Sequence, residues 1–339
     1  MAIKITSEKV QQIADTIFGI NAIARQLPGY EDENFKLTTA SGDSFILKVS
    51  QPEESIDSLE FQDDLLEYVG TKKLAVNLPK VIPNIQGDRV STITSEGKKR
   101  NVRLLSWVNG RLWVKVNPKT KKLRYHLGKQ AGTLTIAMLD FKHSNAHREF
   151  DWDLANAGWT YKYLHLFSSE EKVFISQFQE LYRQIQDIYQ SLPKSIVHND
   201  INDYNILVSK NVEDPQVSGI IDFGDAMYTQ TVNDLAIVLA YAIMEVPDPL
   251  EAALDVLKGY HKQYRFNEDE LKCLYALTAI RWVISVTKAT IYKVEDPSSA
   301  YHVISEKPSW NALKRWSKID PEFAERSFRN ACGFDPHPS

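Results

Sequence analysis

Three polar side chains near the middle of the chain stand at the ends of short apolar runs. Asp200 and Asn205 lie five residues apart in a loop between two such runs, and Asp222 ends a third. Strand ends deliver side chains to places where they can converge. Carboxylate and amide oxygens are hard ligands of the kind that Mg²⁺ prefers. Phosphoryl transfer needs one group that orients or deprotonates the acceptor, together with metal ions that neutralise the phosphate oxygens. The spacing therefore indicates phosphoryl transfer.

The elements that must position these residues form a small β region inside a mostly helical part of the chain. We expect strands at Ile196–His198, Ile206–Val208 and Val217–Ile221. Periodicity predicts helices over residues 118–139, 169–191, 232–245, 249–263, 268–292 and 308–316. Ser168 and Glu171 have capping-box spacing, so the second of these helices should begin there. The third is apolar nearly all round, as expected of a buried helix.

The first hundred residues have a different character, with strand patterns dominating. We expect strands at 35–39, 44–49, 80–82, 91–94 and 101–107, and helices over 7–18 and 55–69. The change in character after Asn109 places a joint near residues 105–112. We therefore divide the chain into a lobe of residues 1–107 and a larger lobe of residues 108–339.

Composition narrows the function classes. The chain has 339 residues, with 40 Lys and Arg against 44 Asp and Glu, a net charge of -4 that disfavours a general nucleic-acid binder. Two cysteines provide neither a disulfide framework nor a cysteine-rich zinc site. No run of about 20 apolar residues is present, so we expect no membrane partner. These features favour a cytoplasmic protein, and they leave the oligomeric state open.

The motif His198-Asn199-Asp200, followed by Asn205 after four intervening residues and then by Asp222-Phe223-Gly224, resembles the aminoglycoside phosphotransferase and choline kinase superfamily. The surrounding residues are most similar to the hydroxylysine kinase family. The resemblance covers essentially the whole chain. It implies an α+β, bilobal protein-kinase-like fold, with a small β-rich N-lobe that covers the nucleotide. The larger, mainly helical C-lobe would carry the catalytic loop and the acceptor pocket.

The resemblance also implies residue roles. Asp200 would be the catalytic carboxylate that accepts the hydroxyl proton of the substrate. Asn205 and Asp222 would bind Mg²⁺. Lys48 would hold the α- and β-phosphates of ATP or GTP, and Glu60 on the following helix would orient that lysine.

A single glycine takes the place of a glycine-rich phosphate loop. Gly29 and Tyr30 would cover the phosphates through backbone N–H groups. The acidic side chains of Glu31, Asp32 and Glu33 would then have to point away. In the larger lobe, Asp234 matches a family aspartate at a buried helix start, where we expect a structural cap.

The favoured acceptor is a small cationic alcohol, hydroxylysine-like, because an ammonium ion needs an anionic pocket. Candidate substrate-binding residues are Asp225, Asp203, Asp153 and Trp152. Trp152 and Trp159 would pack over the substrate by cation–π contact, and Arg148 is a possible partner for a substrate carboxylate.

Several alternatives stay open. Within the same class, the acceptor is an aminoglycoside, homoserine or choline. A protein kinase is disfavoured, because the His198 motif lacks an arginine and no Ala-Pro-Glu segment follows Gly224. An inactive kinase-like binding protein is disfavoured by the intact Lys48, Asp200, Asn205 and Asp222.

Overall fold

The computed structural model describes residues 5–29, 32–52, 54–95, 97–295 and 306–334. The chain divides into two compact units. The first unit contains Met1–Lys73 and Asn77–Asn109, and the second contains Leu74–Val76 and Gly110–Ser339. Among the described helices, none combines the length and the apolar character needed to cross a bilayer.

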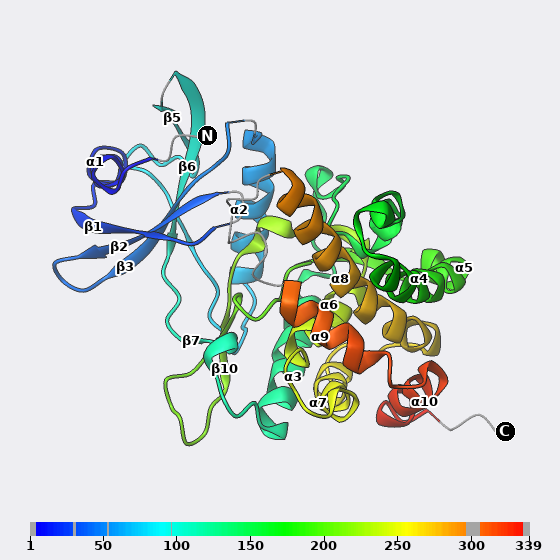
Figure 1. Cartoon of the computed structure of the whole chain (residues 1–339). Coiled ribbons are helices and arrows are strands. Elements are labelled where there is room, and N and C mark those ends of the chain that lie inside the picture. Colours follow the sequence, from blue (N-terminus) through cyan, green and yellow to red (C-terminus); the bar gives the residue numbers. More distant parts are fainter. Residues whose placement is uncertain (1–4, 30–31, 53, 96, 296–305, 335–339) are drawn as a thin grey trace. The chain divides into compact units, whose positions relative to one another are not determined.

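The first unit is built on an antiparallel sheet with the strand order β1-β2-β3-β6-β4, in which β5 also pairs with β6 (Figure 1). The strands are β1 (Ala22–Leu27), β2 (Glu33–Thr39), β3 (Ser44–Val49), β4 (Val81–Ile82), β5 (Ser91–Ser95) and β6 (Lys98–Ser106). Helices α1 (Ser7–Phe18) and α2 (Ile56–Gly70) complete the unit. In the pairing register, Lys48 on β3 lies opposite Asn34 on β2 and Arg103 on β6.

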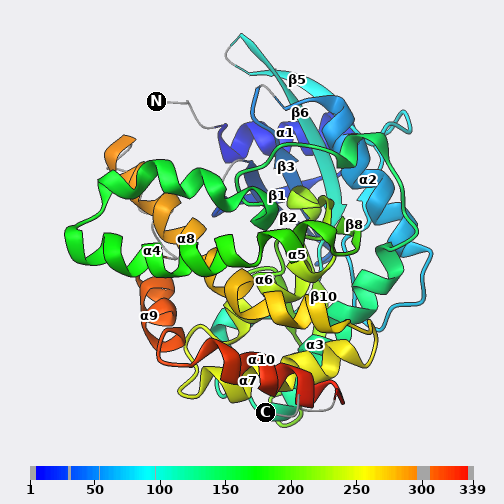
Figure 2. The ribbon, with the colours of Figure 1, turned by 90° about the vertical axis from the view of Figure 1, so that its right-hand side faces the viewer.

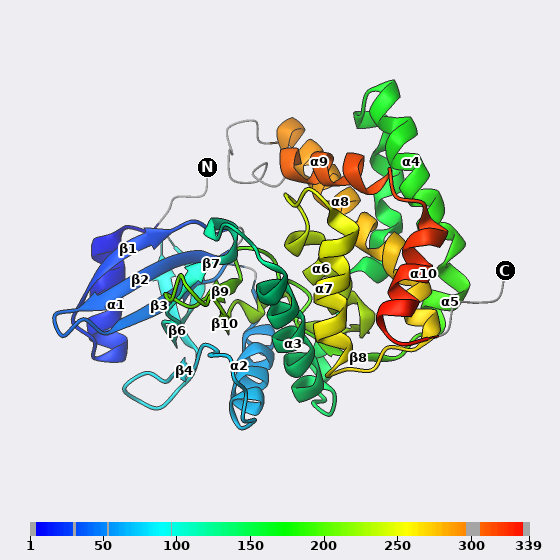
Figure 3. The same ribbon diagram turned by 90° about the horizontal axis from the view of Figure 1, so that it is seen from below.

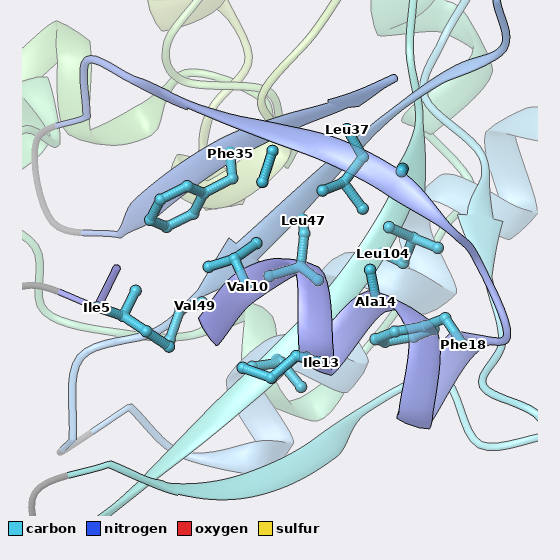
Figure 4. Packing of buried hydrophobic residues seen from close by; sticks show 13 residues of the cluster. Ile5, Val10, Ile13, Ala14, Phe18, Phe35, Leu37, Leu47, Val49 and Leu104 are labelled. Carbon is cyan, nitrogen blue, oxygen red and sulfur yellow. The ribbon is translucent and has the colours of Figure 1, made fainter. Parts of the chain in front are cut away.

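Helix α1 closes one face of this sheet. The side chain of Thr6 accepts a hydrogen bond from the Lys9 N–H and so caps the helix start. The apolar side chains of the helix recur at helical spacing and point at the inward residues of β2, β3 and β6 (Figure 4). The buried cluster includes Val10, Ile13, Ala14, Phe18, Phe35, Leu37, Leu47 and Leu104. Burial of this stripe explains why residues 7–18 are helical.

The second unit is mainly helical, with short strands between the helices. Its α-helices are α3 (Lys121–Met138), α4 (Ser169–Gln184), α5 (Gln186–Ser191), α6 (Val232–Ala242), α7 (Pro249–His261), α8 (Glu268–Glu295), α9 (Glu306–Trp316) and α10 (Pro321–Ala331). Its strands are β7 (Arg111–Leu112), β8 (Lys194–Val197), β9 (Ile206–Val208), β10 (Val217–Ile220) and β11 (Met227–Gln230). Its 3₁₀ segments are η1 (Trp113–Lys115), η2 (Ser144–Ala146), η3 (Leu154–Leu166) and η4 (Phe223–Asp225).

Helices α6 and α8 form the centre of this unit. Every residue of α6 is buried, and α8 packs against α6, α9, η3, α4 and α10. Figure 2 shows α4 beside α8, and α10 against α7. Since most of α8 is surrounded, its buried segment is apolar on nearly every side, and the buried Arg281 stands out within it.

Helices α3 and α7 lie side by side at very short range (Figure 3). A Cβ atom on Gly128 of α3 would stand 1.8 Å from the Val256 carbonyl oxygen, and one on Gly259 of α7 would stand 2.0 Å from the Tyr125 carbonyl oxygen. Both positions therefore need glycine, because any side chain would collide with backbone. This pair of helices supports α6, which contacts both of them.

The α+β fold class is confirmed, with an antiparallel sheet in the first unit and a helical second unit. The capping box of Ser168 and Glu171 is present. The helix expected over 169–191 is interrupted at Ile185, which separates α4 from α5. The structure adds β1, β7, β11, the long 3₁₀ segment η3 and helix α10 to the elements expected from the sequence.

Candidate functional site

The loop between β8 and β9 carries the first polar residues of interest. Two residues there and nearby adopt the left-handed region that side chains rarely visit, Asn199 with φ 64° and Asp222 with φ 66°. Asn199 lies two residues after the end of β8, and Asp222 lies two residues after the end of β10. Such conformations persist only where surrounding contacts determine them, and they cluster at functional sites.

His198 connects the loop to the segment that bears Asp222. Its Nε2 lies 3.1 Å from the Ile221 carbonyl oxygen, and its Nδ1 accepts a hydrogen bond from the Asp200 N–H at 3.3 Å. The ring packs on Phe223 with the centroids 4.5 Å apart. Burial lowers the pKa of His198 to about 4. His198 is therefore a neutral spacer in the core and leaves the acid–base chemistry to its neighbours.

Asp234 binds the backbone of the same loop, between β8 and β9. Its Oδ1 accepts the Asn199 N–H at 2.9 Å, and its Oδ2 accepts the His198 N–H at 3.2 Å. Burial raises the pKa of Asp234 to about 6. The expectation of a helix cap is wrong in detail, because α6 has no side-chain cap at its start. The carboxylate instead satisfies the strained backbone of the loop.

The Asp200 carboxylate is held by three side chains. Its Oδ2 accepts from the amides of Asn202 and Asn205, each at 2.8 Å, and its Oδ1 accepts from Nη2 of Arg281 at 2.8 Å. Asn205 also donates to the Asp200 carbonyl at 2.9 Å. The Asp200 side chain keeps 18% of its surface exposed.

The charges near Asp200 are mostly negative. Burial raises the pKa of Asp200 well above its usual range, the charges of Asp225 and Asp222 raise it further, and Arg281 opposes them. Sequence reasoning brought Asp200, Asp222 and Asp225 together, and the structure places these charges within electrostatic reach of one another. A concentration of like charges around a buried carboxylate is typical of functional sites.

Arg281 is the residue that sequence reasoning missed. Its guanidinium is 2% exposed and lies 4.6 Å from the ring of Trp152 and 5.5 Å from that of Tyr241. It also donates to the Trp152 carbonyl at 3.2 Å. The available signal was a single arginine in a long apolar helical run, because a buried arginine needs a partner.

The two tryptophans expected to cover a substrate cation each cover a cation of the chain itself. Trp152 packs on Arg281, and the ring of Trp159 lies 5.0 Å from Nζ of Lys288. Arg148, considered for a substrate carboxylate, donates to the Gly224 carbonyl at 2.9 Å. Each of these three side chains is therefore engaged by another part of the chain.

Asn205 and Asp222 are the candidate metal ligands. The amide nitrogen of Asn205 is turned to Asp200, so the amide oxygen is the atom that remains for a cation. Asp222 is exposed at the end of its strand. Within the described residues, no group of three or more His, Cys, Asp or Glu could hold a metal alone. One carboxylate and one amide fit Mg²⁺, which keeps water and substrate phosphates among its ligands.

The two acidic substrate-binding candidates Asp225 and Asp203 have different charged neighbours. Asp225 ends η4 beside Asp200 and Arg281, and its charge acts on both. Burial raises the pKa of Asp203 to about 6, and its charged neighbours are Lys119 and Glu245.

Asp153 is 4% exposed. Its Oδ1 accepts from the Ala155 N–H at 3.0 Å, Thr229 at 2.9 Å and Asn233 at 3.3 Å. These contacts make Asp153 the cap of η3 and a core polar group, so we do not retain it among the substrate-binding residues.

The nucleotide-binding candidates lie in the first unit. Lys48 on β3 is 9% exposed, and its Nζ lies 3.4 Å from Asp32. Asp32 therefore points at the lysine and not away from it, contrary to expectation. Glu60 is exposed on α2, and its pairing with Lys48 stays a prediction.

The loop before β2 turns tightly. A Cβ atom on Gly29 would stand 2.3 Å from the Asp32 carbonyl oxygen, so only glycine fits there. Glu33 does point away from Lys48, since it pairs with Arg100 at 2.6 Å. Tyr30 and Glu31 lie outside the described residues.

Comparison with known proteins places this geometry among kinases of small molecules. Hydroxylysine kinase of Danio rerio is 26% identical over 346 residues, which cover 97% of this chain and 97% of the relative. Hydroxylysine kinase of Mus musculus is 28% identical over 338 residues, covering 91% of this chain and 89% of the relative.

A solved structure with a similar fold is a microcompartment-associated aminopropanol kinase, with a TM-score of 0.70 and 19% identity, covering 96% of this chain and 98% of that one. At this identity the likeness shows the fold alone. The model of the phosphotransferase enzyme family matches residues 23–273, a span that includes Lys48, Asp200, Asn205, Asp222 and Asp234. The match covers most of the chain and confirms the resemblance seen in the motifs: the chain belongs to the phosphotransferase enzyme family.

Proposed function

We propose that the chain transfers the γ-phosphoryl group of ATP or GTP to the hydroxyl of a small amine-bearing alcohol, with hydroxylysine as the favoured acceptor. The observation that carries this proposal is the Asp200 carboxylate, held by Asn202, Asn205 and Arg281 beside Asp222. The relatives named hydroxylysine kinase support the choice of acceptor.

Asp200 is the proposed acceptor of the hydroxyl proton. A carboxylate has roughly four lone-pair positions. Asn202 and Asn205 occupy Oδ2, and Arg281 occupies one position on Oδ1. About one position on Oδ1 therefore remains for the acceptor hydroxyl. With the hydroxyl held there, its oxygen forms a bond to the γ-phosphorus, the bond to the β–γ bridging oxygen breaks, and the proton passes to Asp200.

The other roles follow the family pattern. Asn205 and Asp222 would hold Mg²⁺, which when bound neutralises charge on the phosphate oxygens. Lys48 would hold the α- and β-phosphates, with Glu60 orienting it and the backbone at Gly29 and Tyr30 covering them. In this proposal residues 1–107 form the nucleotide-covering lobe, and residues 108–339 carry the catalytic loop and the acceptor pocket.

The ammonium group of the acceptor would lie near Asp225, the acid that acts on both Asp200 and Arg281. Asp203 would supply a second negative charge, and Trp152 would form part of the wall through its contact with Arg281. Both cysteines are free thiols. Free thiols suit a reducing compartment, so we propose that the chain acts in the cytoplasm.

The test is a panel of acceptors with each nucleotide in the presence of Mg²⁺, read out by product mass. The panel contains hydroxylysine, homoserine, choline and an aminoglycoside. We expect hydroxylysine to gain one phosphoryl group with the highest kcat/KM of the four. Transfer to none of them with either nucleotide would contradict the proposed activity. A higher kcat/KM with choline or the aminoglycoside would contradict the proposed acceptor.

A further inference from the structure

A pocket of about 340 Å³ opens beside the second half of α8, and its lining residues have no role in the proposed phosphoryl transfer. Its lining comes from η3 and the residues before it on one side, and from α8 on the other. The residues that matter here are Asp151, Trp159, Lys162, Lys288, Tyr292 and Glu295. The α8 part of this lining lies beyond residues 23–273, the span of the family match. Small-molecule sites begin at about this volume.

The pocket is joined to Asp200 by a continuous series of contacts. Asp200 binds Arg281, and Arg281 packs on Trp152. The preceding residue, Asp151, forms an ion pair with Lys288. Arg281 and Lys288 are seven residues apart on α8, which is about two helical turns or about 10 Å. The two cations therefore stand on the same side of the helix, one at the catalytic carboxylate and one at the pocket.

The pocket carries both signs of charge at close range. Lys288 is 16% exposed, is bound to Asp151 and lies over the Trp159 ring at 5.0 Å. An ammonium group has three donors, so an ion pair with one carboxylate leaves donors for another. Asp151 is 59% exposed and can accept from a second cation. The cation of Lys288 and the anion of Asp151 lie next to each other, with the Trp159 ring beside the lysine. This arrangement matches a ligand that itself carries one positive and one negative charge.

We propose that this pocket binds the α-amino-acid end of the acceptor, with the α-carboxylate at Lys288 and the α-ammonium at Asp151. The inference rests on the proposed function and narrows its acceptor to hydroxylated amino acids. In hydroxylysine, an extended chain separates the hydroxyl oxygen from the carboxyl carbon by about 6 Å. A hydrogen bond of about 2.8 Å at each end brings the reach of the ligand to about 12 Å. Arg281, which binds Asp200, and Lys288 lie about two helical turns apart on α8.

Lys288 then determines specificity, because choline, aminoglycosides and simple amino alcohols have no carboxylate for it. The matching probe is 1-amino-2-propanol, which keeps the hydroxyl and the neighbouring amine of hydroxylysine and lacks its amino-acid end. The second probe is L-lysine, which keeps the amino-acid end and lacks the hydroxyl. Turnover of the first reports the catalytic end alone, and the difference in binding of the second between the wild type and the pocket variants reports the pocket.

The experiment compares Lys288→Met and Asp151→Asn with the wild-type chain. Lys293→Met is the matched control, since Lys293 is on the same helix, pairs with Glu306 at 2.5 Å and is 52% exposed. We expect both pocket variants to lose about 10- to 100-fold in kcat/KM for hydroxylysine through KM, as loss of a hydrogen bond to a charged group implies. Turnover of 1-amino-2-propanol should not change, and Lys293→Met should behave as wild type.

Calorimetric binding of L-lysine separates this inference from the proposed function. Binding to the wild type and Lys293→Met, with weaker binding to Lys288→Met, supports the pocket even where hydroxylysine is not phosphorylated. L-lysine binding without phosphorylation of hydroxylysine would overturn the proposed function but not this inference. Equal L-lysine affinity in the wild type and Lys288→Met, or no binding to the wild type, would overturn the inference and leave phosphoryl transfer standing. Equal losses for both acceptors in Lys288→Met would also overturn it.

Discussion

Replacement of Arg281 by methionine should separate the positioning of Asp200 from the rest of the site. Arg281 is 2% exposed, and its Nη2 is 2.8 Å from the Asp200 carboxylate. Removal of one partner of a buried ion pair costs about 3–5 kcal/mol. Asp200 keeps its bonds to Asn202 and Asn205 and is 18% exposed, so we expect the lower end of that range.

The same change should lower kcat by about 10- to 100-fold, a part of what a positioned base contributes. The KM of the nucleotide should not change. Arg281→Lys should recover part of the lost rate, because lysine restores the charge but not the planar fork that also reaches the Trp152 carbonyl.

The assay combines urea unfolding with steady-state kinetics. Arg329→Met is the control, because Arg329 is 7% exposed and pairs with Glu268 at the start of α8, outside the site. It should lose stability and keep kcat. A cycle with Asp200→Asn then measures the coupling of Arg281 and Asp200 directly. Wild-type kcat in Arg281→Met, or strictly additive losses of stability in the double variant, would refute the reasoning.

Three further predictions concern the metal ligand, the helix contact and the buried histidine. Asp222→Ala should abolish metal-dependent transfer with little change in thermal unfolding, since Asp222 is exposed; full activity across a Mg²⁺ titration would remove it from the metal site. Gly128→Ala places a methyl group 1.8 Å from the Val256 carbonyl oxygen and should cost about 3 kcal/mol or more by urea unfolding, whereas Gly70→Ala, in open space, should be nearly neutral. His198 has a pKa of about 4 in the folded chain against an ordinary 6.5, so the folded state binds fewer protons and stability should fall as pH drops from about 6.5 to 4, by about 3 kcal/mol in all. The loss should be absent from His198→Gln, and identical pH profiles for the two proteins would contradict this assignment.

Regular, strongly patterned elements could be predicted from the sequence, and weakly patterned ones could not. The observed bounds of the strand at residues 44–49 and of the helix at residues 7–18 match the predicted ones. Strand β1 buries only small residues, Ala22 and Ala24, so its alternation carried little signal. The 3₁₀ segment η3 has neither the period of a helix nor that of a strand. Helix α10 does carry a start signal, since Asp320 caps it and Pro321 follows at its first position.

The contacts of the candidate site also fall into predictable local ones and unpredictable tertiary ones. Residues close together in the sequence, such as Asp200 and Asn205, form a local motif whose geometry the loop itself determines. Arg281 reaches the same carboxylate from a helix 81 residues away, and only tertiary packing brings it there. Asp32 at Lys48 is also a tertiary contact, made by the residue just before β2 with a residue of β3. Sequence spacing does not encode contacts of that kind.

The measurement that tests the central claim most directly is the product mass of hydroxylysine after incubation with nucleotide and Mg²⁺, for the wild type and for Asp200→Asn. Asparagine keeps the size of the side chain and removes its ability to accept the hydroxyl proton. We expect one phosphoryl group on the acceptor with the wild type, and a turnover lower by about 10²- to 10⁴-fold in the variant. Near-normal turnover in Asp200→Asn, or an unmodified acceptor with the wild type, would contradict the account.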